Sequence, residues 1–504
     1  MARLFIFLIH VFLLGSSAAE AQSGPDGAKY VLSQAFQRLG GEEKLRSVAA
    51  VKLKGMSVSN ALEQSVRPEG PWFQRYADFT EIRRFEPAAL RTDLRSRGAD
   101  ASFWANPKWA ETTSLVTSGA SFAVVSGKLR PSSQARVDDA EETLALGPER
   151  VLLTARAAKD LRLNAPTTFY GQPAHSLSFT WQGHPVRLLL GSVSFMPLAV
   201  ETQRAKPMDI FWAPWGEITT RVEWQGWMAE NYGIQYPRLW HVSANGQPLH
   251  TRMIDWVEFN PSFEADALTA SDELIAAAKK GRRPISAATF PAERGEIVAP
   301  GITLFQGAWN VVEAAGPNGV YVIEGPISNE YSRAAIARAR KDGRKLLGVI
   351  TTSDSWPHIG GMREYVAEGV PVIGLDLNRP VLERLFAAPH RQEPDRLAQK
   401  PRRLNWRAIG EPTTIGTGKS SMRLIPMRTV TGERQMVIYW PAHKLLYTSD
   451  IMTPAKDNIW LPQYRNEVRH VIAREGLDVQ TVFGMHYAPV AWASIQSLPA
   501  PPGQ

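Results

Sequence analysis

The 504-residue chain contains no cysteine, and this absence excludes several classes of protein. Without cysteine there can be no disulfide, no thiolate metal ligand, no cysteine nucleophile and no lipid-modified cysteine. A chain of this length can still stabilise itself by burying an apolar core, so an oxidising compartment is not excluded. Any metal site must therefore do without thiolate ligands.

Long apolar runs are scarce as well. The exception is the run 4–14, which follows Arg3 and precedes the small-residue pattern of 19–21. The run is too short to span a bilayer, and the pattern after it is typical of a cleavage site. We therefore expect a signal peptide at 1–21 and a soluble mature protein, periplasmic or secreted from a bacterium. A retained membrane anchor is the alternative.

Dense clusters of one charge are also missing. The net charge is +8, but lysine and arginine are spread along the chain, and the densest basic run is Lys400-Pro401-Arg402-Arg403. Such a short run is typical of a solvated loop rather than a nucleic-acid surface, so we expect no nucleic-acid partner. The length predicts two or three domains.

The first half of the chain is rich in strand patterns. A helix is predicted over Asp26–Arg46, with a glycine stop at Gly40-Gly41, and a strand over Val48–Gly55. Ten of the sixteen tryptophans lie in 22–284, which favours an aromatic inner face over scattered exposure. Further strands are predicted at Phe122–Val125, Ser176–Trp181, Val186–Leu190, Ile218–Trp224, Arg238–Val242 and Thr251–Phe259.

This order of a helix followed by strand meanders resembles the half-barrels of periplasmic lipoprotein carriers. The resemblance implies a concave sheet able to hold an apolar or other small ligand. Plain core packing is the alternative role for the tryptophans. Trp212 and Trp215 lie in a turn-rich segment, where we expect an exposed binding lip. A basic, proline-containing stretch, Lys279–Pro284, marks the predicted domain boundary.

After this boundary, strands and helices alternate. The loop Thr351–Gly361 lies between a buried strand, Leu346–Ile350, and a helix predicted to run from Gly361 to Glu368. His358 is in this loop, where catalytic and ligand side chains are common. The other predicted elements are strands at 298–305, 310–313, 319–326, 371–375, 422–426, 435–440, 444–447 and 479–483, and helices at 328–341, 379–387 and 463–474.

The loop resembles the metal-binding loop of the metallo-β-lactamase-fold hydrolases, His-x-His-x-Asp-His followed by Gly-Gly. In the six motif positions this chain has Ser353, Asp354, Ser355, Trp356, Pro357 and His358, with Gly360-Gly361 close behind. Only the last histidine is kept. The resemblance implies an αβ/βα sandwich. The fold class we predict is therefore α+β, with a mainly antiparallel β half-barrel domain (22–284) before a metallo-β-lactamase-like domain (285–504).

Other landmarks of that family can be placed on this sequence. Glu324-Gly325 stands where the family has Asp-x-Gly after its first strand, and Arg428 replaces the histidine of Pro-x-His-Thr. Asp450 keeps the aspartate of the family's Gly-Asp position, and His486 keeps its last histidine.

The resemblance implies two metal subsites, of which one has lost its histidine ligands and the other has kept three of its four ligands. One would use Ser353, Ser355, Arg428 and Asp450, and hydroxyl and guanidinium groups do not replace its histidines as ligands. The other would use the position of Pro357 together with the three retained residues His358, Asp450 and His486. Two histidines and one carboxylate are a common set for a catalytic site with one metal, such as Zn or Fe.

Two hypotheses follow. In the first, the protein has a degenerate metal centre, is non-catalytic and acts by binding a ligand or partner; Asp450 could then pair with Arg428 without metal. In the second, it is a mononuclear metal-dependent hydrolase of an ester-, thioester- or lactone-like substrate. Arg428 would stabilise the oxyanion, and Asp354 or Glu324 would act as base or orienting group.

Overall fold

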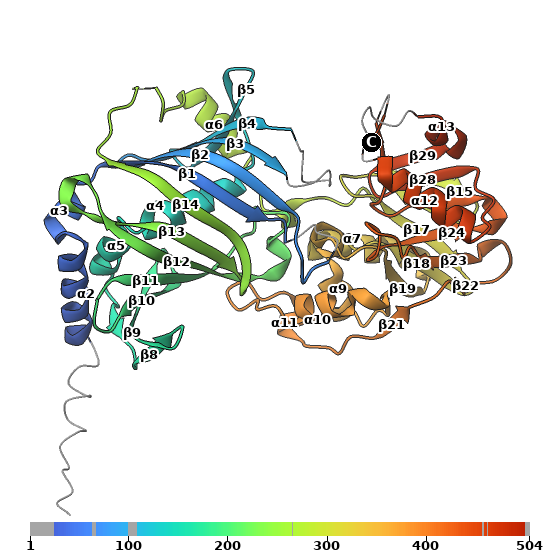
Figure 1. Ribbon diagram of the computed structural model, residues 1–504. Helices are drawn as coiled ribbons and strands as arrows, with labels where there is room; N and C mark the ends of the chain where they lie inside the picture. Colours follow the sequence, from blue (N-terminus) through green and yellow to red (C-terminus); the bar gives the residue numbers. More distant parts are fainter. Residues whose placement is uncertain are drawn as a thin grey trace, which may run out of the picture.

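The computed structural model describes residues 25–62, 67–98, 108–264, 266–455, 458–460 and 462–498. The expected signal peptide at 1–21 lies outside these residues. Figure 1 shows two parts side by side, one containing the strands up to β14 and the other the strands from β15 onwards. Among the described residues, no helix is both long enough and apolar enough to span a membrane.

The first part is built on one sheet of fourteen strands, in the order β6-β5-β4-β3-β2-β1-β14-β13-β12-β11-β10-β9-β7, with β8 paired to β9. Neighbouring strands pair antiparallel throughout. The strands are β1 (Ala50–Asn60), β2 (Gln74–Phe85), β3 (Ala88–Gly98), β4 (Ala110–Thr117), β5 (Ala120–Val125), β6 (Lys128–Pro131), β7 (Arg162–Leu163), β8 (Thr167–Phe169), β9 (Gln172–Trp181), β10 (His184–Gly191), β11 (Pro197–Ala205), β12 (Glu217–Ala229), β13 (Gln235–Ala244) and β14 (Gln247–Phe259).

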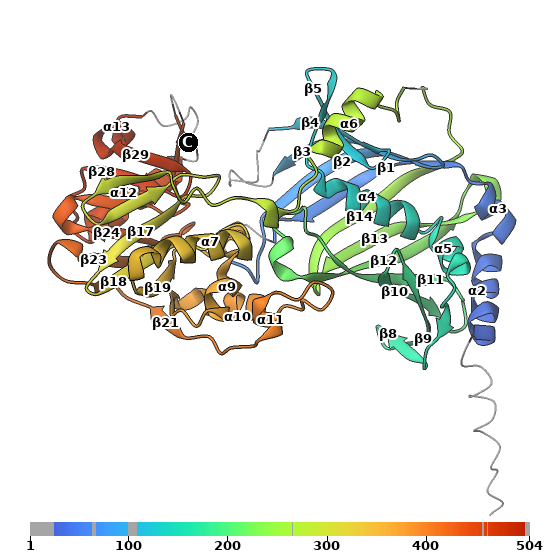
Figure 2. The ribbon, with the colours of Figure 1, turned by 180° about the vertical axis from the view of Figure 1, so that it is seen from behind.

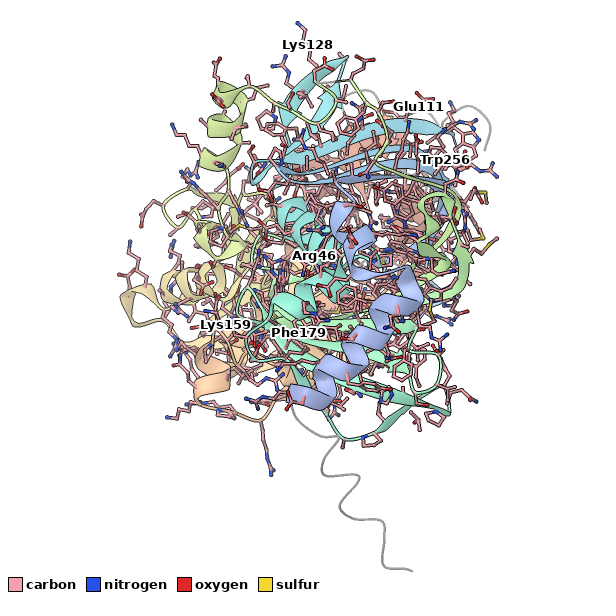
Figure 3. All side chains as sticks on the ribbon, turned by 90° about the vertical axis from the view of Figure 1, so that its left-hand side faces the viewer. Arg46, Glu111, Lys128, Lys159, Phe179 and Trp256 are labelled. Carbon is pink, nitrogen blue, oxygen red and sulfur yellow. The ribbon has the colours of Figure 1, made fainter. Side chains whose placement is uncertain are left out.

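Helices cover one face of this sheet. The expected first helix is α2 (Pro25–Leu39), and after Gly40-Gly41 the chain forms the separate short helix α3 (Glu42–Ser47). Figure 3 shows both at the end of the sheet that faces away from the second part. Apolar residues of α2 and of α5 (Val151–Ala157) share a core with the strands, while α4 (Ala135–Leu146) runs across the sheet (Figure 2).

The second part contains two mixed sheets packed face to face. The strands of the first sheet pair antiparallel from β15 to β18 and parallel from β18 onwards. They are β15 (Gly295–Ala299), β16 (Ile302–Phe305), β17 (Val311–Gly316), β18 (Gly319–Ile323), β19 (Leu346–Thr351), β20 (Val372–Leu375) and β21 (Trp406–Ile409). The second has the order β22 (Thr413–Ile415), β23 (Met422–Pro426), β24 (Met436–Trp440), β25 (Leu445–Tyr447), β28 (Thr481–Gly484) and β29 (Tyr487–Ala491). One apolar core contains residues of both sheets. A two-stranded sheet, β26 (Thr453–Ala455) and β27 (Asn458–Trp460), lies between β25 and β28 in the chain.

Helices cover the outer face of each of these sheets. Two separate apolar cores join helices to sheets, one for the first sheet and one for the second. The first sheet is covered by α7 (Asn329–Ala339), α9 (Met362–Ala367), α10 (Arg379–Ala387) and α11 (Arg396–Gln399), and the second by α12 (Pro462–Arg474) and α13 (Trp492–Gln496). The layers are therefore helix, sheet, sheet and helix, as the αβ/βα expectation requires.

The two parts share no sheet, since the first sheet ends with Phe259 of β14 and the next begins with Gly295 of β15. The connection contains α6 (Asp272–Lys280). A domain boundary near 284 stays a prediction, because sheet membership does not test independent folding.

Three tryptophans meet where the two parts touch. Trp356 packs edge-on against Trp212 and Trp215 of the first part, with ring centroids 4.8 Å apart in each pair. The expected exposed lip at Trp212 and Trp215 is therefore wrong: Trp215 is buried, and Trp212 is half-buried against Trp356. A turn-rich segment indicates exposure only where no other segment covers it, and here Trp356, more than a hundred positions away, covers both rings. Backbone contacts such as Glu217 N to the Pro389 carbonyl, 3.0 Å, support the same junction.

Candidate metal centre

Three chain segments bring His358, Asp450 and His486 together. His358 lies in the short helix α8 (Trp356–Ile359), just after the parallel strand β19. Asp450 follows β25, and His486 lies in the turn that joins β28 to β29. β25 and β28 are parallel neighbours, so their carboxyl ends lie at the same edge of the second sheet. This pairing places the aspartate beside the final histidine.

Asp450 lies between the two imidazole rings. Its Oδ1 is 2.8 Å from His486 Nε2, and its Oδ2 is 3.3 Å from His358 Nε2. One ligand atom from each of the three residues lies within 4.8 Å of the other two. The sequence resemblance selected these three residues as metal ligands, and the structure brings them together.

The orientation of His486 is fixed from its other nitrogen. Nδ1 is 3.3 Å from the backbone carbonyl of Ala308, which can only accept, so Nδ1 carries a proton in this contact. Burial opposes charge on this ring, but the hydrogen bond and the charge of Asp450 outweigh burial and raise the pKa of His486. His486 forms an ion pair with Asp450 when its ring is protonated. Histidines that bind metals commonly donate their second ring proton to a carbonyl or carboxylate in this way.

His358 is almost completely buried and has an unused nitrogen. Burial lowers the pKa of His358 to about 4, despite the nearby charge of Asp450. The ring is therefore neutral at pH 7, which is the form that binds metals. Its Nδ1 has no hydrogen-bond partner among the described residues. A buried polar atom without a partner is rare in folded proteins and needs an explanation.

The position of Asp450 between the two Nε2 atoms fits one divalent ion, whereas the unpaired Nδ1 of His358 is the other ring nitrogen and does not face Asp450. Two imidazoles and one carboxylate form the ligand set of many catalytic sites that keep a coordination position open. Asp450 is ionised, because its two histidine partners outweigh the effect of burial and lower the pKa of its carboxyl. Metal binding would replace the proton that His486 Nε2 shares with Asp450.

Two residues at the other expected subsite, Ser353 and Arg428, have partners outside the trio. Ser353 is buried, and its Oγ accepts a hydrogen bond from the backbone N of Ser355 at 3.2 Å. The alternative pairing of Arg428 with Asp450 is wrong, because Arg428 Nη2 donates to Asp376 Oδ1 at 2.9 Å and to the Gly410 carbonyl at 3.0 Å. Its expected role in stabilising an oxyanion stays a prediction, and its charge is already engaged by Asp376.

Asp354 is placed next to the metal loop but faces a different partner. Its Oδ2 is 3.3 Å from Arg434 Nε. Arg434 is also 3.8 Å from Glu69, which belongs to the connection between β1 and β2 in the first part. Burial raises the pKa of Asp354 to about 7, and Arg434 only partly opposes this effect. The expected catalytic role of Asp354 stays a prediction.

Glu324, which follows β18, is completely buried in a cluster of hydroxyl groups. Thr352 donates to its Oε1 through Oγ1, and Tyr447 donates to the same oxygen at 3.2 Å. Burial raises the pKa of Glu324 to about 7; the bonds from Thr352 and Tyr447 oppose this shift, and the charge of Asp450 adds to it. Glu324 can therefore hold or release a proton near neutral pH.

Sequence reasoning named Glu324 but missed its two hydroxyl partners. Thr352 is the residue before the first motif position, and Tyr447 is the last residue of β25, three before Asp450. A polar residue at the end of a buried strand, close to a retained ligand, was the available signal. The Ala308 carbonyl could not have been found, since a backbone contact leaves no trace in residue type.

The raised pKa of Asp354 predicts a pH-dependent stability. A carboxyl whose pKa is higher in the folded state stabilises the fold below its unfolded value, near 4, and loses this contribution as the pH rises through about 7. We expect Asp354→Asn to raise the free energy of unfolding relative to the parent by a few kcal/mol, on the order of the shift, at pH 8 but not at pH 4. Urea unfolding at both values measures this difference.

Asp395→Asn is the matched control. Asp395 binds Arg363, and although burial opposes it, this contact lowers the pKa of Asp395 to about 2. Its contribution is complete above about 4, so the change in unfolding free energy should be constant between pH 5 and pH 8. A similar constant change for Asp354→Asn would contradict the raised pKa.

Comparison with known proteins gives the following result. No family model matches the chain, and no curated protein matches it. Solved structures similar to 40% of the chain include DIM-1 metallo-β-lactamase, with 15% identity, 92% of its own length covered and a TM-score of 0.32. The metallo-β-lactamase from Pontibacter korlensis has 12% identity, 94% coverage and the same TM-score over the same share of this chain. The metallo-β-lactamase from Erythrobacter litoralis has 14% identity, 92% of its own length covered and a TM-score of 0.30, again over 40% of this chain.

These TM-scores are too low for the likeness to carry an argument. The solved structures named above are metallo-β-lactamases, the same class that the loop resembles.

Proposed function

We propose that His358, Asp450 and His486 bind one divalent metal ion, such as Zn or Fe, and that the protein is a mononuclear metal-dependent hydrolase. The observation that carries this proposal is that Asp450 faces one nitrogen of each histidine, at 2.8 Å and 3.3 Å. An ester-, thioester- or lactone-like substrate is proposed from the family resemblance alone.

Each residue has a separate task in this proposal. A metal ion bound here supplies Lewis acidity and lowers the pKa of a water molecule to about 7. His486 is oriented by the Ala308 carbonyl, and His358 stays neutral because it is buried. Glu324, with its pKa near 7 and its bonds to Thr352 and Tyr447, holds a proton that the reaction can use.

Metal content and hydrolysis, measured together, test the proposal. Protein purified without chelator and dialysed against Zn²⁺ or Fe²⁺ should retain about one equivalent, as a site with one complete ligand set requires. It should then hydrolyse at least one of a phenyl ester, an acyl thioester and a γ-lactone. His486→Ala should lose both properties, and His470→Ala, which changes an exposed histidine of α12, should lose neither. Less than about a tenth of an equivalent after reconstitution would contradict the metal site.

A second function is favoured by a separate observation. Without metal, Asp450 is already in contact with His486 at 2.8 Å, and Ser353, Ser355 and Arg428 stand where the family resemblance implies metal-binding histidines. A protein with this centre could be non-catalytic and act by binding a ligand or partner. Stoichiometric metal with no turnover of the three substrate classes would favour this function over the hydrolase.

The cellular location of the protein and its division into domains are also part of this proposal. We expect a bacterial periplasmic or secreted protein, cleaved after residue 21, with domains at 22–284 and 285–504. N-terminal sequencing of protein recovered from the periplasm or medium tests the first point. A mature N-terminus at 22 is expected, and recovery with the membrane fraction would contradict it.

A further inference from the structure

A cavity of ≈ 220 Å³ lies in the first part, between α4 and the strands β11 to β14. Figure 2 shows α4 crossing this region of the sheet. The cavity is remote in sequence from the proposed metal ligands, and no residue of the trio contributes to its wall. It therefore needs an explanation of its own.

Much of the sheet side of the wall is apolar because alternate residues point to one face of each strand. β12 contributes Ile218, Val222 and Trp224, and β13 contributes Trp240 and Val242. The same wall also contains polar and charged side chains, which include Thr202 and Thr220 of the strands. A space with an apolar surface and a few polar groups is typical of sites that bind small organic molecules.

The charged groups at the wall are already paired. Lys206 Nζ is 2.6 Å from Asp139, and Arg252 Nη2 is 3.0 Å from Glu81. Burial lowers the pKa of His250 to about 4, so this ring is neutral at pH 7. A charged ligand would have to break an ion pair or lose its hydration without compensation.

The two remaining carboxylates of the wall are also satisfied by the protein. Glu142 Oε1 accepts from the Thr202 hydroxyl at 2.6 Å. Asp209 Oδ1 accepts from the backbone N–H groups of Phe211 and Trp212, at 2.8 and 3.2 Å. These carboxylates thus have local donors and do not require a cationic ligand.

One hydrogen-bond donor at the wall is left over. The indole Nε1–H of Trp224 is buried and has no acceptor among the described residues. By contrast, Nε1–H of Trp240, which also lines the cavity, donates to the Pro237 carbonyl at 3.0 Å. A buried indole donor normally has a partner, so the free donor of Trp224 indicates a missing acceptor.

We propose that this cavity binds an uncharged, largely apolar molecule that accepts one hydrogen bond from Trp224, as a carbonyl oxygen would. A cavity of about 150 Å³ in another protein holds one benzene molecule, so the space here suits roughly ten non-hydrogen atoms. This site is independent of the proposed metal centre and does not rest on hydrolase activity.

Four compounds of similar size test separately the effect of a hydrogen-bond acceptor, of a negative charge and of a positive charge on binding. 1-Tetralone carries one carbonyl group, tetralin lacks it, 1-naphthoate is an anion and 1-naphthylmethylamine is a cation at pH 7. Equilibrium dialysis with the full mature chain should give a Kd for 1-tetralone below about 1 mM. Tetralin should bind about tenfold more weakly, since the donor then stays unpaired. Both charged compounds should bind more weakly than tetralin.

Two tryptophan variants locate the hydrogen bond. Trp224→Phe removes the donor and should reduce the tenfold preference for 1-tetralone over tetralin to about one. Trp227→Phe is the matched control, because Nε1–H of Trp227 is also buried without a partner among the described residues, but Trp227 is not part of the wall. The preference should remain tenfold in this control.

A third variant tests the position of the ligand. Val242→Phe fills the cavity and should weaken 1-tetralone and tetralin alike by at least tenfold, with circular dichroism confirming the fold; if this variant does not fold, the tryptophan pair decides. Failure of the folded parent to bind 1-tetralone at 1 mM would overturn the proposal. The proposal would also be overturned if either charged compound bound as tightly as tetralin or more tightly. The same holds if Trp224→Phe and Trp227→Phe changed the preference for 1-tetralone over tetralin equally.

Discussion

Asp450→Asn is expected to reduce bound metal from about one equivalent to below a tenth, with metal affinity lowered by more than about 100-fold. The carboxylate faces both histidines, so its loss removes one ligand and the charge that offsets the ion. A neutral amide oxygen is a weaker ligand for Zn²⁺ or Fe²⁺ than a carboxylate. Elemental analysis after dialysis, together with competition against a chromophoric chelator, measures both quantities.

The matched control for this variant is Asp376→Asn. Asp376 is also an aspartate with a charged partner at 2.9 Å, but that partner is Arg428 and not a histidine of the trio. Its metal content should equal that of the parent. Retention of metal by Asp450→Asn, with a loss in Asp376→Asn, would mean that the ion is bound at a different place.

Metal affinity should also rise with pH. Asp450 raises the pKa of His486, and a metal ion must displace the proton at Nε2. Affinity should therefore increase as the pH rises through the raised pKa of His486 and become constant above it. An affinity that does not change with pH would contradict His486 as a ligand.

Arg83→Met is expected to be the most destabilising single change in the first part. Arg83 is fully buried on β2, with its guanidinium 2.7 Å from Glu81 and 2.8 Å from Glu149. Its removal leaves two buried carboxylates without the cation that they share, although Arg252 remains 3.0 Å from Glu81. Breaking a buried ion pair in this way costs about 3–5 kcal/mol. Urea unfolding monitored by tryptophan fluorescence gives the free energy of unfolding.

Two controls separate the buried charge from the loss of an arginine as such. Arg379→Met removes an exposed arginine that pairs with Glu383, and exposed pairs contribute about 0–1 kcal/mol. The double variant Arg83→Met/Glu149→Gln restores charge balance and should recover part of the lost stability. No recovery would indicate that stacking of the Arg83 guanidinium on the Trp240 ring, rather than its ion pairs, dominates the effect.

The same network predicts how the parent responds to acid. Burial would raise the pKa of Glu81, but Arg252 and Arg83 outweigh it and lower this pKa to about 2. The contribution of Glu81 is therefore complete above its unfolded pKa, near 4.3, and is lost as the pH falls towards 2. Arg83→Met should show a smaller loss of stability over this interval than the parent.

Much of the second part could be predicted from the chain itself. Ser328 was expected to begin a helix, and its Oγ accepts from the backbone N of Tyr331 at 3.2 Å at the start of α7. The strand before the loop is β19, and His358 follows it as expected. These predictions succeeded because apolar runs, capping residues and glycine stops act on neighbours in sequence.

Predictions that depended on distant partners were less reliable. Trp212 and Trp215 are covered by Trp356, and Arg428 pairs with Asp376 and not with Asp450. Arg83 was not singled out, because an arginine in a strand is normally expected at the surface. In each case the residue type is compatible with several environments, and only a contact with a remote segment selects one.

The sequence by itself determined the candidate ligands, because His358, Asp450 and His486 lie in local patterns that resemble the metal-binding positions of a known family. Only the tertiary structure decided that these three meet, that His358 is neutral and that Arg428 lies apart. It also formed the cavity and left the indole N–H of Trp224 at its wall without an acceptor among the described residues. Distances, burial and pKa shifts arise from segments brought together by packing, and a linear pattern carries no direct record of them.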